Sequence, residues 1–146
     1  MKAPLATLAL LAALTAVPAA AQTGSGAGAV GLTFQGIEQP RGAVMFAVFD
    51  NAEAYAGRGA PVRGDRVEVT GATAVARLEG LAPGRYAIKA FHDLDGDGTM
   101  DTNPFGLPTE PYAFSNDAPA RFGPPGFAAA AFTVGAGDTV HTITLR

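Results

Sequence analysis

The chain contains no cysteine, only two histidines and few basic residues, and each shortage narrows its possible functions. Without cysteine there is no disulfide and no thiolate ligand for a metal. Two histidines without a thiol argue against a zinc site. The sequence also lacks a phosphate-binding glycine loop, a dinucleotide-binding pattern and a serine nucleophile elbow. These absences argue against several large classes of enzyme.

The N-terminus has the pattern of a secretory signal peptide. The first two residues give a basic start, residues 5–17 are apolar and uncharged, and residues 19–21 (Ala-Ala-Ala) fit the small-x-small cleavage pattern. The apolar run is shorter than the ~20 residues that span a bilayer, and a retained anchor is the alternative. We therefore expect residues 1–21 to be removed. The mature protein would begin at Gln22, lack a membrane span and be periplasmic or extracellular.

The mature part holds nine basic and thirteen acidic residues, which gives a net charge of −4. Nucleic acid is not an expected partner, because no basic patch is present to neutralise phosphates. Residues 22–28 are rich in Gly, Ser and Ala and predict a flexible linker. Residues 29–146 have the length of a single domain with a modest core.

Short runs of alternating apolar and polar residues predict about seven strands joined by turns. The expected strands cover residues 30–35, 44–49, 66–70, 74–78, 86–92, 128–134 and 139–145. Residues 44–49 are apolar on both faces and predict a central strand, and the last two strands are expected to form a hairpin. There is no convincing amphipathic helix, although residues 51–64 have room for one helical turn. We therefore predict an all-β fold, an antiparallel β-sandwich of immunoglobulin-like or transthyretin-like type. The Leu-x-Pro-Gly-x-Tyr-x-Ile pattern at residues 81–88 resembles the strand entry of transthyretin-like and carboxypeptidase-regulatory-like sandwiches.

An acidic stretch directly follows the expected strand 86–92. Counted from Asp93, carboxylates stand at the first, third, fifth and ninth positions, and Gly98 stands at the sixth. Alternating short carboxylates on a curling backbone suit Ca²⁺, which takes six to eight oxygen ligands. An EF-hand would need glutamate at the twelfth position and flanking helices, but this chain has Pro104 and no helices there. The pattern is more similar to the short acidic calcium loops that cap strands or form thrombospondin type-3 repeats.

The predicted ligands of this Ca²⁺ are oxygen donors from the acidic stretch and its surroundings: Asp93, Asp95, Asp97, the main-chain carbonyl of Thr99, Asp101, Asn103 and Glu110. His92, directly before the loop, is a candidate for holding a ligand in place. The alternative is a charged turn whose carboxylates accept hydrogen bonds from backbone N–H groups. Mutual repulsion of four carboxylates within nine residues favours the metal.

Residues 104–127 form a long proline-rich connection that holds five of the twelve aromatic residues: Phe105, Tyr112, Phe114, Phe122 and Phe127. One interpretation is a self-packed loop whose rings seal one end of the sandwich. The other is an aromatic recognition surface made by Phe105, Tyr112, Phe114 and Phe122. The first is favoured, because rings in a small domain are mostly part of the core.

The histidines and the one serine near them do not predict catalysis. His92 and His141 each lie on a strand face that otherwise carries apolar residues, so a structural role is favoured for both over a metal ligand or a general base. Ser115, His92 and Asp117 are the residue types of a catalytic triad, but nothing in the local sequence around Ser115 resembles a nucleophile turn.

Three segments together resemble a bacterial family of domains of unknown function, family 2141. They are residues 93–103, then Gly-x-Pro-x-Glu-x-Tyr-x-Phe-Ser-Asn at 106–116, then Gly-Pro-Pro-x-Phe at 123–127. The resemblance runs from about residue 30 to the C-terminus and implies an exported β-sandwich without an established activity. The family frequently has asparagine where this chain has Asp95 and Asp97, and glycine where it has Ala113. The first difference makes this loop more acidic and strengthens the metal prediction here.

The sequence therefore predicts a small exported sandwich with a Ca²⁺-stabilised loop, acting as a non-enzymatic binding or envelope accessory module. Its partner would be an envelope protein, a peptide or a glycan. One alternative is a hydrolase-like enzyme with a cleft formed by His92 and the 104–127 loop. Another is a carbohydrate or peptide binder that uses the loop aromatics.

Overall fold

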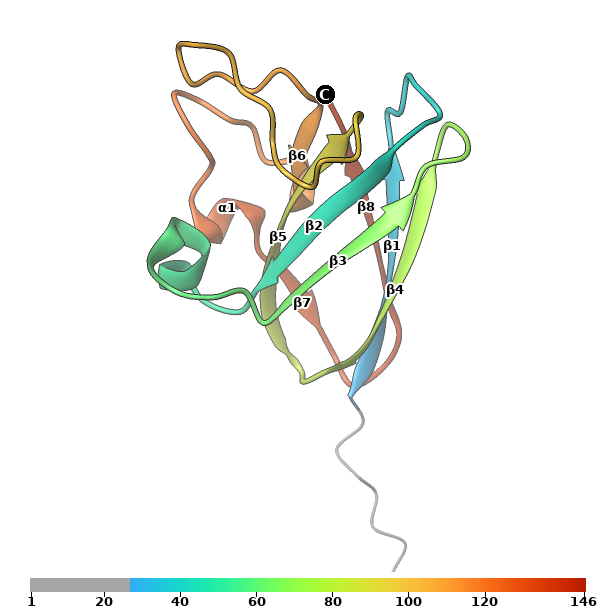
Figure 1. Cartoon of the computed structure of the whole chain (residues 1–146). Coiled ribbons are helices and arrows are strands. Elements are labelled where there is room, and N and C mark those ends of the chain that lie inside the picture. Colours follow the sequence, from blue (N-terminus) through green and yellow to red (C-terminus); the bar gives the residue numbers. More distant parts are fainter. Residues whose placement is uncertain (1–26) are drawn as a thin grey trace, which may run out of the picture.

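The computed structural model describes residues 27–146, which form a sandwich of two β-sheets (Figure 1). The predicted signal peptide and all but the end of the predicted linker lie outside the described residues. Gly28, the last residue of that linker, already begins the first strand. Within the described part, no helix has the length and apolar character needed to cross a bilayer.

Eight strands and three short helical segments make up the domain. The strands are β1 (Gly28–Gln35), β2 (Ala43–Phe49), β3 (Arg63–Glu68), β4 (Ala74–Leu81), β5 (Gly84–Asp93), β6 (Tyr112–Phe114), β7 (Phe132–Val134) and β8 (Thr139–Thr144). The helical segments are η1 (Ala54–Arg58), η2 (Ser115–Asp117) and α1 (Phe127–Ala130). The prediction of an all-β sandwich is confirmed, with one strand more than expected because β6 lies inside the long connection.

The smaller sheet has three strands in the order β4-β1-β8, and the larger has five, in the order β3-β2-β5-β6 with β7 also on β5. β5 organises the larger sheet. Its residues 87–93 pair with β2, residues 89–91 with β6 and residues 84–86 with β7. Its C-terminal end delivers Asp93 into the acidic loop, as the sequence predicts.

Two expectations about topology are wrong. β7 and β8 do not form a hairpin, because the turn between them crosses from the larger sheet to the smaller one. β8 instead pairs with β1, and it does so in parallel, with Val30 opposite Thr139. The sandwich is therefore not antiparallel throughout. Its immunoglobulin-like or transthyretin-like type stays a prediction.

The main core lies between the two sheets and follows the alternation of the strands. The inward-facing residues include Val30, Leu32 and Phe34 of β1, Val44, Phe46 and Val48 of β2, and Ile88 and Ala90 of β5. The Phe34 and Phe46 rings meet at a centroid distance of 5.3 Å. Burial of each large apolar side chain stabilises the fold by about 1.5–3 kcal/mol.

The outer face of the larger sheet is apolar as well. Met45 lies opposite Phe91, and Ala47 lies opposite Lys89, so these outward side chains form a continuous surface. A second cluster covers one part of this face: Phe49, Ala54, Tyr55, Ala87, Phe114, Ala118 and Ala130. The loops that follow β5 and precede α1 extend at the end of the molecule where the C-terminus lies (Figure 1). They flank the part of the face that this cluster leaves uncovered.

Candidate functional site

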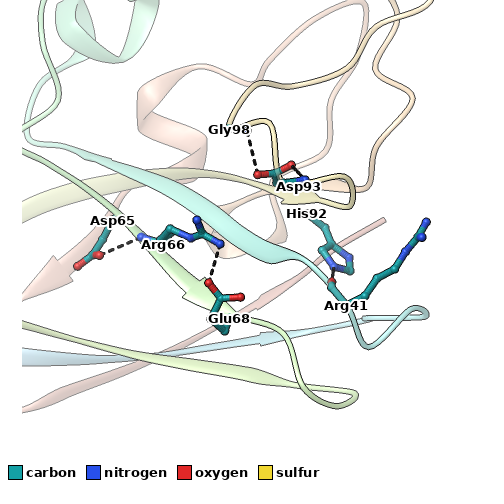
Figure 2. Close-up of polar contacts among 8 residues, drawn as sticks. Arg41, Asp65, Arg66, Glu68, His92, Asp93 and Gly98 are labelled. Carbon is teal, nitrogen blue, oxygen red and sulfur yellow. Dashed lines mark hydrogen bonds and ion pairs between the residues drawn. The ribbon is translucent and has the colours of Figure 1, made fainter.

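The acidic loop folds around the side chain of Asp93, which is 1 % exposed. Its Oδ1 accepts a hydrogen bond from the N–H of Gly96 at 2.8 Å, and its Oδ2 accepts one from the N–H of Gly98 at 3.0 Å (Figure 2). Gly98 has φ +80°, a conformation that residues with a Cβ resist, so glycine permits the predicted sharp turn. Asp93 therefore fixes the path of the loop from its first position.

Glu110 joins the two ends of the same loop. This carboxylate is 6 % exposed and comes from the segment just before β6. Its Oε1 accepts from the N–H of Leu94 at 2.7 Å, and its Oε2 accepts from the N–H of Asp101 at 3.1 Å. A single side chain thus holds both ends of the acidic loop against the start of β6.

The middle of the loop is exposed and hydrogen-bonds within itself. Asp95 accepts from the N–H of Asp97 at 3.1 Å, and Asp97 accepts from both the N–H and the hydroxyl of Thr99, at 2.7 and 2.8 Å. The Thr99 N–H, and after it the hydroxyl, lower the pKa of the Asp97 carboxyl. These turns leave the remaining lone pairs of the carboxylates available to a cation.

The five predicted carboxylate ligands come together as two overlapping groups. Oxygens of Asp93, Asp95 and Asp97 lie within 4.8 Å of one another, and so do oxygens of Asp95, Asp101 and Glu110. Partial loss of hydration, followed by the negative charges of Asp95 and Glu110, raises the pKa of Asp101. This clustering agrees with the sequence prediction, and the binding of a metal stays a prediction.

Asn103 is the predicted ligand whose side-chain oxygen is engaged elsewhere. Its Oδ1 accepts from the N–H groups of Phe105 and Leu107, at 2.9 and 3.1 Å. The backbone N–H of Asn103 also donates to the carbonyl of Leu107 at 2.9 Å, so residues 101–109 form a small hairpin beside the acidic loop. Asn103 thereby shapes the hairpin that carries Phe105 at its tip.

His92 supports the loop from the core side. It is 1 % exposed, and its Nε2 lies 2.7 Å from the carbonyl oxygen of Arg41 (Figure 2). Because a carbonyl only accepts, Nε2 carries the proton. The neighbouring Gly42 has φ +69°, and a Cβ there would collide with the carbonyl of Asp93. His92 and Gly42 thus lock the start of β2 against the base of the loop.

The residue types of a catalytic triad do not assemble. Ser115 is fully buried, donates to the carbonyl of Ala130 and accepts from the N–H of Ile88 at 2.8 Å. Asp117 accepts from the N–H of Thr144 at 2.7 Å. Among the described residues, none of the hydrogen bonds of Ser115, His92 and Asp117 joins two of the three.

His141 also has a structural position. Its ring stacks on Phe132 at a centroid distance of 4.3 Å, and its Nε2 accepts from the N–H of Asn116 at 3.1 Å. Burial lowers the pKa of His141, while the charge of Asp117 acts in the opposite direction. The favoured interpretation of both histidines as structural residues therefore agrees with their surroundings.

The aromatic residues of the long connection divide into two groups. Phe114 is buried in the second cluster, Tyr112 meets its ring edge-on at 5.8 Å, and Phe127 packs against Tyr55 at 6.0 Å. Phe105 is 89 % exposed and Phe122 is fully exposed. Three of the five rings thus pack as in the self-packed interpretation, and two project into solvent.

Sequence reasoning missed a groove of about 1170 Å³ on the uncovered outer face of the larger sheet. Its floor includes Met45, Ala47, Lys89 and Phe91, with Tyr112 and Phe114 beside them. One wall comes from Met100 and residues 106–108, and the other from Ala120 and residues 122–124. One feature of the sequence could have indicated the groove: β2 is apolar on both faces. A sheet with an apolar outer face is normally covered by other parts of the protein or by a ligand.

The groove and the acidic loop are structurally joined. The loop runs from Asp93 into Met100, and the hairpin held by Asn103 presents Leu107 to the groove. Glu110 secures both ends of the acidic loop next to this wall. The acidic loop and one wall of the groove therefore belong to one continuous segment that Glu110 holds in place.

Comparison with known proteins places this architecture in a family. No curated protein and no solved structure matches the chain. A family model described as "Uncharacterized protein conserved in bacteria (DUF2141)" matches residues 32–142, from β1 to β8. This range includes the acidic loop, the hairpin and both walls of the groove. The chain therefore belongs to the DUF2141 family of bacterial proteins, as the resemblance of its central motifs indicates.

Proposed function

We propose that this protein is an exported, non-enzymatic binding module whose acidic loop holds Ca²⁺ beside a ligand-binding groove. The observation that carries the proposal is the groove of about 1170 Å³ with its mainly apolar lining. Its size is close to that of small-molecule sites, which occupy roughly 300–1,000 Å³ and are lined mostly by apolar side chains with a few polar groups. An open apolar surface of this kind on a small domain favours binding.

The positions of the ionisable residues support binding over hydrolysis. His92, the candidate base of a hydrolase, is enclosed and donates to a backbone carbonyl, and it does not line the groove. Both oxygens of Glu110 accept backbone hydrogen bonds. The alternative of a carbohydrate or peptide binder draws on the exposed rings of Phe105 and Phe122.

Electrostatics supports Ca²⁺ in the acidic loop. Five carboxylates lie in two groups that share Asp95, and no cationic side chain forms an ion pair with any of them among the described residues. Repulsion between carboxylates destabilises the folded loop, and a divalent ion turns it into attraction. Ca²⁺ suits such a site because it accepts irregular arrangements of six to eight oxygens, whereas Mg²⁺ demands a near-ideal octahedron.

Thermal melts in calcium, magnesium and chelator test the metal. Calcium at a hundred times its dissociation constant should add about 2.7 kcal/mol to the free energy of unfolding. Calcium should be tested at millimolar levels, because extracellular modules often bind it at about 10⁻⁴–10⁻³ M. Equal melting temperatures of the wild type in calcium and in chelator would contradict the metal site.

A matched pair of double variants assigns the effect to the loop. Asp95→Ala with Asp97→Ala should abolish the calcium effect, because both side-chain oxygen ligands are removed. Glu79→Gln with Asp138→Asn removes the same charge from exposed ion pairs with Arg77 and should preserve it. Loss of the calcium effect in both variants would indicate a general dependence on charge.

Export is tested by N-terminal sequencing of protein recovered from the periplasm or the medium. The Ala-Ala-Ala pattern at residues 19–21 predicts Gln22 as the first residue of the mature protein. Recovery of the protein with residues 1–21 still attached would contradict cleavage and favour a retained anchor.

A further inference from the structure

The groove has an apolar floor that residues 27–146, the part the structure describes, leave uncovered. Met45 and Phe91 stand side by side on neighbouring strands, and Ala47 follows on the same face. Toward the other end of the strands, Phe49 and Ala87 are sealed by the second cluster. The groove therefore continues the outer hydrophobic surface of the sheet beyond its covered part, as an extended trough.

The walls present apolar side chains to solvent. Leu107 is 60 % exposed, and Phe122 is fully exposed although its backbone adopts φ +55°. A bulky residue at positive φ is uncommon and strained, and such strain is concentrated at binding and catalytic sites. The two residues lie on opposite walls, on the hairpin and on the 118–126 segment. An apolar occupant of the groove would lie between these two side chains.

Lys89 supplies one cation at the boundary between the groove and the second cluster. Its Nζ donates to the carbonyl of Tyr55 at 2.6 Å and lies 4.5 Å from the centroid of the Tyr55 ring. Burial lowers the pKa of Lys89. An ammonium has three donors, and this hydrogen bond uses one of them. Among the described residues Lys89 forms no ion pair with a carboxylate.

The other charges that line the groove are already balanced. Arg66 pairs with Glu68 at 2.6 Å, and Asp65 accepts a hydrogen bond from the N–H of Arg66 at 2.9 Å (Figure 2). Asp65 also pairs with Arg63 at 3.5 Å. The cation of the groove that lacks a carboxylate partner is therefore Lys89, and it favours an occupant with one negative charge.

The backbone of the groove disfavours a peptide as that occupant. The floor is the face of a sheet, and its N–H and C=O groups bond within the sheet to neighbouring strands. Each wall includes a proline, Pro108 and Pro124, which has no N–H to offer. A peptide in the groove would bury amides without partners, at a cost of about 1–3 kcal/mol for each unpaired group. An alkyl chain carries no such groups.

We propose that the groove binds a fatty-acid carboxylate, with the alkyl chain along Met45 and Phe91 and the head group at Lys89. This inference rests on the proposed binding function and specifies its ligand. The chain would lie between Leu107 and Phe122, where two flexible methionines, Met45 and Met100, adapt to its shape. The carboxylate would keep its single negative charge beside the ammonium of Lys89.

Calorimetric titration of the exported protein with monomeric dodecanoate tests the ligand, in buffer without added calcium because calcium precipitates fatty acids. We expect saturable binding at one site, and dodecyltrimethylammonium, with a similar chain and the opposite charge, should bind at least about tenfold more weakly. Equal binding of the two amphiphiles would overturn the role of Lys89. No heat of binding with dodecanoate, or tighter binding of an extended apolar peptide, would overturn the choice of ligand.

Surface variants locate the site without disturbing the core. Leu107→Ser with Phe122→Ser should weaken dodecanoate binding about tenfold, because two exposed apolar contacts are lost. The matched control is Val75→Ser with Val140→Ser, which changes two exposed residues of the smaller sheet and should bind like the wild type. Equal affinities of the two double variants would place binding elsewhere.

A single variant tests whether Lys89 binds the head group of the ligand. The calcium melts distinguish failure of the fatty-acid proposal from failure of the metal-site proposal. Lys89→Met keeps most of the side-chain volume and should reduce the preference for dodecanoate over the cationic amphiphile; an unchanged preference would refute the assignment. If this variant does not fold, the amphiphile comparison on the wild type decides the same question. A calcium-dependent melt without dodecanoate binding would refute the fatty-acid ligand and leave the metal site standing.

Discussion

Replacing Glu110 with glutamine tests how the acidic loop is held. The carboxylate accepts the N–H of Leu94 and the N–H of Asp101, and it is 6 % exposed. Hydrogen bonds to a charged group contribute about 1.5–3 kcal/mol each. The glutamine amide has one acceptor oxygen, so it keeps one of the two backbone hydrogen bonds, now to an uncharged group. Its NH₂ faces the other N–H, and that hydrogen bond is lost. Relief of the repulsion with Asp101 offsets only a small part of this loss, because solvent screens that exposed carboxylate.

We therefore expect Glu110→Gln to lower the free energy of unfolding by about 2–3 kcal/mol in chelator. Denaturant unfolding at constant pH measures this directly, and a thermal melt should fall by about 10 °C for a domain of this size. Glu79→Gln is the matched control, since its carboxylate is exposed and pairs only with Arg77, and it should change stability by less than about 0.5 kcal/mol.

Calcium separates the two roles that the structure gives to Glu110. If this carboxylate also contributes to the cation site, the gap between wild type and Glu110→Gln should widen when calcium is added. A constant gap would leave Glu110 as a structural clamp alone. A variant as stable as the wild type in chelator would refute the clamp, because it would mean that repulsion cancels both hydrogen bonds.

Four further variants test other parts of the chain. Phe114→Ala should lower the free energy of unfolding by about 3–5 kcal/mol because its ring is buried, whereas Phe122→Ala should be near neutral; equal melts of the two would contradict the division of the aromatics. The pKa of His141 is lowered in the folded state, so the unfolded chain binds its proton first, and stability should fall as pH drops below about 6.5. His141→Gln should flatten that part of the profile of melting temperature against pH. The pKa of Asp101 is raised, so in chelator its share of stability should fall as pH rises from the ordinary carboxyl range through the raised pKa, and Asp101→Asn should remove this share.

Much of the fold was predictable, because local alternation reports which strand faces are buried. The inward set of β5, including Ile88 and Ala90, follows directly from its two-residue period. Which strands pair with one another was harder to predict, because the alternation of apolar and polar residues does not indicate which strands become neighbours. The turn between β7 and β8 has the glycines of a hairpin, yet it carries the chain to the smaller sheet, where β8 lies beside β1.

The acidic loop was predictable for a different reason. Its carboxylates are close in sequence, so their proximity in space needed little knowledge of the fold, and Glu110 alone comes from a distance. The groove was not predictable in the same way. It depends on Phe91 and Leu107, which meet only after the hairpin folds back over β5. In the sequence, the groove was indicated only by the apolar outer face of β2. The same pattern is expected for a strand that other parts of the protein cover on both faces.

The position of β1 has a consequence for the order in which the molecule forms. This strand is near the start of the described chain and is the middle strand of the smaller sheet, yet one of its two partners is β8. The side chains of Gln35 and Thr144, 109 residues apart, are hydrogen-bonded at 3.0 Å across that pair. Closing so long a loop is costly in entropy, and contacts of high sequence separation slow folding. We therefore expect one edge of β1 to stay unpaired until β8 has been synthesised. If the proposed export takes place with the chain unfolded, the late arrival of β8 would delay completion of the smaller sheet during translocation.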